Sequence, residues 1–113
     1  MRQDTPDIIR GTLDLLILKA LSWGPAHGYG VARWIEQATN DALAVGEGTL
    51  YPALHRLEER GWVAATWGAS ENNRQAKFYA LTRQGRTQLL AEAANWRRYA
   101  AAIFAALDAP ALE

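Results

Sequence analysis

One short segment, residues 45–61, constrains the fold more than any other part of this 113-residue chain. Three leucines recur in it at helical spacing and form one apolar stripe: Leu50, Leu54 and Leu57. Gly61 can adopt the left-handed conformation that ends helices, so we expect a helix that begins at Gly48 or Thr49 and stops at Gly61. Because only one side of this helix is apolar, the helix must pack on a core and expose its other side.

The exposed side of this helix carries groups that suit contact with nucleic acid. Pro52 is expected in or just past the first turn, where backbone N–H groups have few intrahelical acceptors, so the proline helps to fix the helix start. The free N–H groups at that end favour phosphate. The candidate contacts are the side chains that the inward leucines leave exposed: Thr49, Tyr51, Pro52, His55 and Arg56.

Each of these candidates also has an ordinary structural interpretation. Tyr51 can donate its hydroxyl to a phosphate or a base edge, or it can close the hydrophobic core. Thr49 serves equally well as a helix cap, and His55 as a solvated surface histidine. Arg56 suits a phosphate or a guanine edge, although an ion pair on the helix surface, worth little in free energy, is the alternative.

Two runs rich in β-branched and aromatic residues follow the helix, at residues 62–67 and 77–81, and we expect both to form strands. The stretch between them, residues 68–76, is rich in turn-forming residues and too long for a two-residue hairpin. An αα-hairpin followed by an unrelated ribbon is the alternative, but a lone ribbon is marginally stable unless it packs on helices. The strand pair therefore predicts a wing that packs on the helices before it.

Two further helices are expected nearer the N-terminus. The first has Thr12 as its N-cap and ends near Ser22, and the second runs from Tyr29 to Gln37. The first is apolar over more than one face: Leu13, Leu16, Ile17, Ala20 and Leu21 form one stripe, and Leu15 and Leu18 lie outside it. The order helix, helix, helix, strand, loop, strand predicts an α+β, mainly α fold, a winged helix-turn-helix.

The C-terminal part is expected to form one long helix, from Arg83 to about Leu107, with Thr82 as its cap. Six of its residues, separated by 4, 3, 4, 3 and 4 positions, form a heptad seam: Leu89, Ala93, Trp96, Ala100, Ile103 and Leu107. The chain then divides into a winged-helix DNA-binding domain, residues 1–82, and a C-terminal dimerisation helix, residues 83–113.

Such a seam has too little of its own fold to cover it, so we expect a homodimer. Leu15 and Leu18 of the over-apolar first helix are expected to add to the interface. The alternative is that the C-terminal helix folds back on its own domain. A dimer also has a functional logic, because a two-fold protein binds a two-fold DNA site with half-sites about one helical turn apart.

Trp96 is a candidate effector site as well as an interface residue. Small alanines at positions 93 and 100 leave room beside its large flat ring, with Tyr99 as a neighbour, and an aromatic compound can stack there. The alternative is that Trp96 only fills the dimer core.

Charge locates the attraction to DNA in the wing. Twelve basic and twelve acidic residues give the chain a net charge of zero. Residues 62–88, however, contain four basic residues and one acidic residue. Arg74 and Lys77 are the best candidates there for phosphate or minor-groove contact, with a solvated face as the alternative. Asn73 shapes the turn first and contacts DNA second.

Composition argues against an enzyme and against a cofactor. The chain has two histidines and no cysteine, and its sequence contains no glycine-rich phosphate loop and no metal-ligand spacing. Disulfides, Fe–S clusters and thiolate chemistry are therefore excluded, and a reducing cytoplasm suits the chain. No apolar run reaches the roughly 18 residues of a membrane span. We expect a cytoplasmic protein with no bound metal and no membrane partner.

Taken together, these motifs resemble the PadR-type transcriptional regulators, which are small winged-helix dimers. The resemblance covers nearly the whole chain and rests on Gly11–Leu21, Gly24-Pro25-x-His27-Gly28-Tyr29-Gly30, Gly48–Glu58, Gly61-Trp62-Val63 and Asn73-Arg74-x-x-Lys77-Phe78-Tyr79-x-Leu81-Thr82-x-x-Gly85. The short tail is similar to the smaller of the two architectural classes of that family.

The resemblance implies a regulator that binds a double-stranded operator and represses nearby genes, often until a small molecule relieves the repression. Phenolic acids and multidrug compounds are the effectors that the family suggests. Within the motif around residues 27–30, the resemblance and the turn chemistry indicate a structural role, and Tyr29 is a further candidate phosphate contact. Gln75 departs from the family pattern, since many relatives carry a second basic residue at that point of the wing tip.

A winged helix used only for protein–protein assembly is the competing function, because the neutral net charge weakens the electrostatic case for DNA. Salt dependence distinguishes the two. A DNA-binding dimer loses affinity steeply between low and moderate salt, whereas a protein-binding module does not bind duplex DNA at all.

Overall fold

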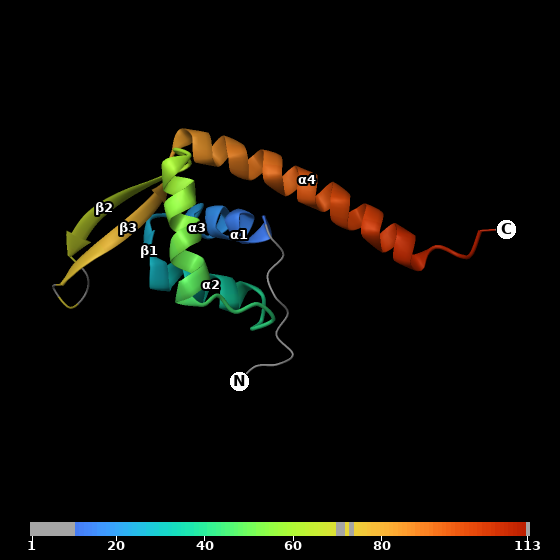
Figure 1. Cartoon of the computed structure of the whole chain (residues 1–113), viewed down its shortest axis with the longest axis horizontal. Coiled ribbons are helices and arrows are strands. Elements are labelled where there is room, and N and C mark those ends of the chain that lie inside the picture. The colour runs from blue at the N-terminus through green and yellow to red at the C-terminus, as the bar shows by residue number, and fades with distance from the viewer. Residues whose placement is uncertain (1–10, 70–71, 73, 113) are drawn as a thin grey trace.

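The computed structural model describes residues 11–69, 72 and 74–112, and its element order is that of a winged helix (Figure 1). The elements are α1 (Thr12–Leu21), β1 (Ala26–His27), α2 (Gly28–Ala38), α3 (Glu47–Glu59), β2 (Val63–Ala69), β3 (Gln75–Leu81) and α4 (Arg83–Asp108). The first three helices form a compact group with the sheet at one side, and α4 projects away from it. The expected α+β, mainly helical architecture is confirmed.

The core lies where α1, α2 and α3 meet the sheet. α1 packs against α2, α3, α4 and β3, so it is covered on several sides. The fully buried side chains come from all three helices and β2: Ile17, Leu18, Leu21, Val31, Ile35, Leu50, Leu54, Leu57 and Val63. Leu18, which the sequence placed outside the core stripe, is buried because α1 has neighbours on more than one face.

The sheet is antiparallel, with β3 between β1 and β2. Both wing strands are longer than expected, and each extends two residues further toward the wing tip. The short strand β1 was not predicted, because two residues after a Gly-Pro turn carry no alternating pattern. Its pairing joins His27 to Phe78 of β3 and thereby anchors the wing to the start of α2.

The starts of two helices differ from expectation. Thr12 is the first residue of α1 and not its cap, since Gly11 occupies the N-cap position in the left-handed region (φ 94°). α3 begins at Glu47, with Gly46 as its N-cap, so Pro52 falls in the second turn. At that position the ring nitrogen of Pro52 has no hydrogen to donate to the carbonyl of Gly48.

The end of α3 and the start of α4 form one tightly packed junction. Gly61 ends α3 in the left-handed region (φ 79°), as expected, while the N–H of Trp62 donates to the Leu57 carbonyl at 3.1 Å. The hydroxyl of Thr82 donates to the Gly61 carbonyl at 2.7 Å and accepts from the N–H of Gly85 at 3.0 Å, which confirms Thr82 as the cap of α4. The direction of α4 is therefore fixed relative to α3.

Candidate nucleic-acid interface

The exposed half of α3 has two flanks, and the candidate contacts divide between them. Leu50, Ala53, Leu54 and Leu57 face the core. Positions 51 and 56 lie about 140° apart around a helix, so Tyr51 and Arg56 cannot share one narrow face. Tyr51 lies on the flank nearer the wing, Arg56 and Thr49 on the flank nearer α1, and Pro52 and His55 on the outer ridge between them.

Tyr51 is held in position by the start of α2. Its ring lies so close to Gly28 that a Cβ added there would be 2.7 Å from both Cε1 and the hydroxyl oxygen of Tyr51. The residue is still 43 % exposed, so one part of the ring is packed while another part faces solvent. The glycine at position 28 is therefore required for the close approach of this tyrosine.

The buried Tyr79 of β3 lies behind this surface. Burial raises the pKa of its hydroxyl above the ordinary 10.0, Glu58 and Tyr51 raise it further, and Lys77 opposes them. The hydroxyl therefore stays neutral at neutral pH. The same interactions place Tyr51 and Glu58 of α3 and Lys77 of β3 near one point between the helix and the wing.

Arg56 is engaged on the opposite flank. Its guanidinium donates to the Asp14 carboxylate of α1 at 2.9 Å, and Arg60 approaches the same carboxylate at 3.9 Å. The Asp14 side chain is only 16 % exposed, so this ion pair joins α1 to α3 in a partly shielded position. The structure gives Arg56 a partner within the fold and does not bring it together with Tyr51.

The wing contributes one of its predicted cations to the side of α3 that carries Tyr51. Lys77 approaches Glu58 at 3.6 Å, and its ammonium lies 5.5 Å from the centre of the Tyr79 ring. Arg74 is exposed next to the wing tip, where its interactions leave it further from α3 in the sequence of β3. Asn73 lies outside the described residues.

Trp67 is a surface residue of the wing that the sequence interpretation missed. It lies directly opposite Lys77 in the β2–β3 pair and is 68 % exposed. Opposed residues of an antiparallel pair share one face of the sheet, so Trp67 shares the face of Lys77 and Tyr79. The alternation from buried Val63 to Trp67 along the strand, continued against a lysine in the partner strand, was the available signal.

The motif around residues 27–30 has the expected structural role. The Nδ1 atom of His27 accepts the N–H of Gly30 at 2.9 Å and caps α2. The His27 ring also lies 5.8 Å from the ring of Phe78 and 6.2 Å from that of Tyr29, measured between centres. Tyr29 is 66 % exposed at the first turn of α2, and its hydroxyl is accessible to a ligand.

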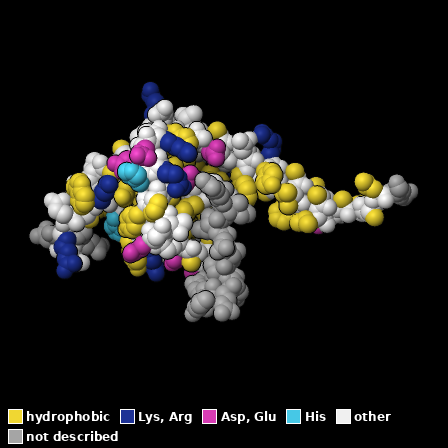
Figure 2. All heavy atoms as spheres, in the orientation of Figure 1, with side chains coloured by type: hydrophobic (Ala, Val, Ile, Leu, Met, Phe, Trp, Pro, Cys, Tyr) yellow, Lys and Arg dark blue, Asp and Glu magenta, His cyan; other side chains and the backbone are white. Residues whose placement is uncertain are grey.

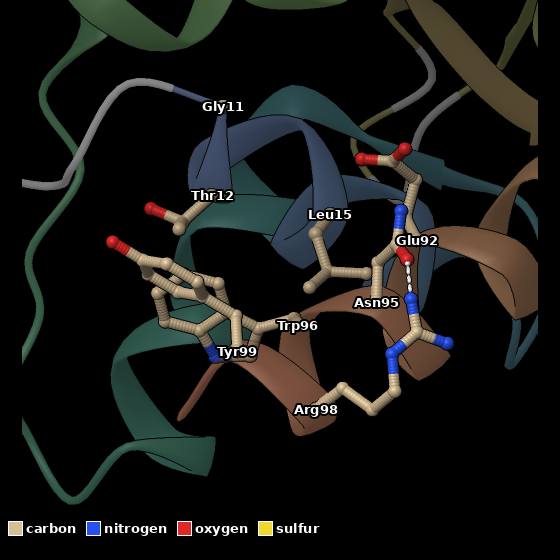
Figure 3. Close-up of a pocket in the computed structure, with 8 residues that line it drawn as sticks. All are labelled: Gly11, Thr12, Leu15, Glu92, Asn95, Trp96, Arg98 and Tyr99. Carbon is tan, nitrogen blue, oxygen red and sulfur yellow. Dashed lines mark hydrogen bonds between the residues drawn. The ribbon is translucent and has the colours of Figure 1, made fainter. Parts of the chain in front are cut away.

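A pocket of about 640 Å³ separates α1 from α4. Figure 3 shows Trp96 and Tyr99 of α4 together on one side of it, with Thr12 and Leu15 of α1 across from them. The two aromatic rings are tilted, with their centres 5.7 Å apart. Asn95 and Arg98, joined by a 2.6 Å hydrogen bond, close another side of the pocket. The pocket thus pairs aromatic surface with polar groups.

The predicted seam of α4 is covered at one end and exposed at the other. Hydrophobic side chains gather along the part of α4 that projects from the compact group (Figure 2). Trp96, Tyr99, Ile103 and Leu107 are 37 %, 59 %, 43 % and 72 % exposed, and Phe104, outside the predicted seam, is 64 % exposed. Leu18 and Leu89, by contrast, are buried in the core of their own chain, at 0 % and 9 % exposure. This corrects the expectation that they form the interface.

Two other classes of site find no support in the described part of the chain. Its histidine and carboxylate side chains form no group of three or more that would hold a metal ion. None of the helices within it is both long and apolar enough to cross a membrane.

Comparison with known proteins agrees with this geometry. Residues 17–91 match the transcriptional regulator PadR-like family. An uncharacterised protein of Lysinibacillus sphaericus is 32 % identical over 90 residues, which are 80 % of this chain and 83 % of that protein. The solved structure of a transcriptional regulator from Clostridium thermocellum aligns with a TM-score of 0.77 at 30 % identity, covering 87 % of this chain and 95 % of the other. A PadR family regulator from Eggerthella lenta aligns with a TM-score of 0.74 at 29 % identity, covering 89 % and 86 %.

Proposed function

Because this chain belongs to the PadR-like family of transcriptional regulators, which act by binding DNA, we propose that it is a homodimeric repressor of a two-fold operator. One observation carries the proposal. Tyr51 of the recognition helix α3 and Lys77 of the wing converge on the same side of the molecule, on either side of the buried Tyr79. A helix and a wing that present donors side by side can contact adjacent parts of one duplex.

The exposed seam of α4 supports the dimer. Trp96, Ile103 and Leu107 repeat at heptad spacing on a helix whose far half has no covering element in the described chain. A second copy of α4 would cover these side chains and would hold the two recognition helices at a defined separation. The two-fold axis of the dimer then matches the two-fold symmetry of the operator.

The pocket beside Trp96 supports control by a small aromatic molecule. A flat compound that stacks on Trp96 and Tyr99 would also reach the polar groups of Asn95 and Arg98. It would shift the equilibrium only by its difference in affinity for the DNA-binding and non-binding arrangements of the dimer. Titration with aromatic carboxylic acids, monitored by quenching of Trp96 fluorescence in a variant whose other tryptophans are phenylalanine, tests this part of the proposal.

Assembly with another protein, without DNA, is the second candidate function. Its supporting observation is that Arg56 and Lys77 are each paired with a carboxylate, which lowers the positive potential of the surface. Titration of the duplex upstream of its own gene over a range of salt concentrations separates the two functions. Affinity that falls steeply with salt supports the repressor, and no duplex binding at low salt supports the alternative.

Tyr51→Phe and Arg74→Ala are each expected to weaken operator binding without unfolding the protein. A lost hydrogen bond to a charged phosphate costs about 1.5–3 kcal/mol, so the Tyr51 variant should bind about tenfold more weakly or worse. The Arg74 variant should also reduce the steepness of the salt dependence by about 0.9 in the log–log slope. Arg97→Ala, which removes the same charge from exposed α4, is the matched control. Full binding by both variants would contradict this recognition surface.

Gly28→Ala is expected to weaken operator binding by displacing the Tyr51 ring. A Cβ at 2.7 Å from the ring forces the partly exposed tyrosine outward, and the fold can tolerate that movement. We expect a loss of about tenfold in affinity, near the loss caused by Tyr51→Phe. In a Tyr51→Phe background, Gly28→Ala should have almost no further effect, because the hydroxyl that it displaces is already absent. Additive losses would mean that Gly28 acts by another route.

A further inference from the structure

Lys77 is held within the protein by a carboxylate from the recognition helix. Its ammonium lies 3.6 Å from Glu58, and the two side chains are 37 % and 35 % exposed. The ammonium also lies over the ring of Tyr79. A cation held in this way is partly neutralised before any DNA arrives, and a phosphate must compete with the carboxylate for it.

The other two ion pairs of α3 do not have the same position. The pair of Arg56 with Asp14 joins α3 to α1 on the flank away from the wing. His55 and Glu59 are 70 % and 66 % exposed, and a pair so accessible to solvent contributes little. Among the ion pairs of α3 in the described structure, the one between Glu58 and Lys77 therefore stands out, since it joins the recognition helix to the wing.

We propose that Glu58 determines specificity by keeping Lys77 from backbone phosphate on DNA of the wrong sequence. The inference rests on the proposed function as an operator-binding regulator. Sequence-independent binding depends on contacts between cations and phosphates, so a paired Lys77 costs it one contact. At the operator, the base contacts of α3 hold the protein in one register, and the Glu58–Lys77 pair keeps the wing beside the helix. Glu58 thus lowers random binding more than operator binding.

The test compares Glu58→Gln with the wild-type dimer on two duplexes of equal length, one from upstream of its own gene and one of random sequence. We expect Glu58→Gln to bind the random duplex about three- to fivefold more tightly at low salt, the size of effect that a partly exposed ion pair can give. The salt dependence of that binding should steepen by about 0.9 in the log–log slope, the signature of one added phosphate contact. Operator affinity should change less than twofold, so the ratio of the two affinities should fall.

Two controls separate this role from a general effect of charge or structure. Asp108→Asn changes the net charge equally at the far end of α4 and should leave both affinities unchanged. In a Lys77→Gln background, Glu58→Gln should have no effect on random binding, since Glu58 is expected to act through Lys77. A random-duplex affinity or salt slope that matches the wild type overturns the inference, as does an equal gain in the Lys77→Gln background. If the wild type binds neither duplex, the proposed function itself fails; if it binds the operator and only the variant prediction fails, the function stands without this role for Glu58.

Discussion

Trp96→Glu is expected to convert the dimer into monomers and to weaken operator binding at least about 100-fold, because two half-sites would no longer be bound as one unit. Trp96 sits at the start of the exposed part of the seam, where a partner helix would bury it. A carboxylate in that position would have to be desolvated without a counter-charge each time a dimer formed. Sedimentation velocity measures the oligomeric state, and titration of the operator duplex measures the affinity.

Ala94→Glu is the matched control for this substitution. Ala94 is exposed on the same helix, about 160° around the axis from Trp96, so the same charge enters on the face opposite the seam. It should leave both the dimer and the affinity intact. An intact Trp96→Glu dimer would show that the seam is elsewhere, and monomers of both variants would point to a general effect of charge on α4.

Gly85→Ala is expected to destabilise the fold by about 3 kcal/mol, at the upper end of the cost of inserting a methyl group into packed structure. The added Cβ would lie 2.0 Å from the carbonyl oxygen of Trp62, a backbone atom that cannot rotate away. The Thr82 bonds to Gly61 and to Gly85 surround the same point, so relief of the clash must separate α4 from the end of α3. Chemical unfolding at fixed protein concentration measures the loss.

Gly48→Ala provides the comparison for a helical glycine with free space around it. No atom lies within 4 Å of a Cβ placed at Gly48, and its backbone is helical. Alanine there should be neutral or should stabilise the fold by roughly 0.5–1 kcal/mol, the difference in helix propensity. A Gly85→Ala variant as stable as Gly48→Ala would mean that the junction between α3 and α4 is looser than its contacts indicate.

The helices were predictable because their signals are local. The leucine repeat of α3, the left-handed stop at Gly61 and the Thr82 cap of α4 each depend on residues within a few positions of one another. The same reasoning failed at the start of α1. Thr12 has the right side chain for a cap, but the chain turns at Gly11 instead.

The assignment of side chains to surfaces was less predictable. Periodicity identified Arg56 as exposed, but it could not reveal that Asp14, 42 positions earlier, lies within 2.9 Å of it. For the same reason, Leu18 and Leu89 were expected at an interface although they are buried in their own chain. Trp67 was missed because the register that sets it opposite Lys77 depends on the pairing of two strands.

The sequence alone determined the order of the elements, the basic wing and the apolar seam of α4, because spacing, caps and composition act along the chain. Only the tertiary structure decided which exposed side chains belong together. It set Tyr51 against Gly28, Lys77 beside Glu58, and Arg56 against a different helix. The physical reason is that these neighbours are brought together by the packing of α3 between α1 and the wing, and packing depends on the whole core at once.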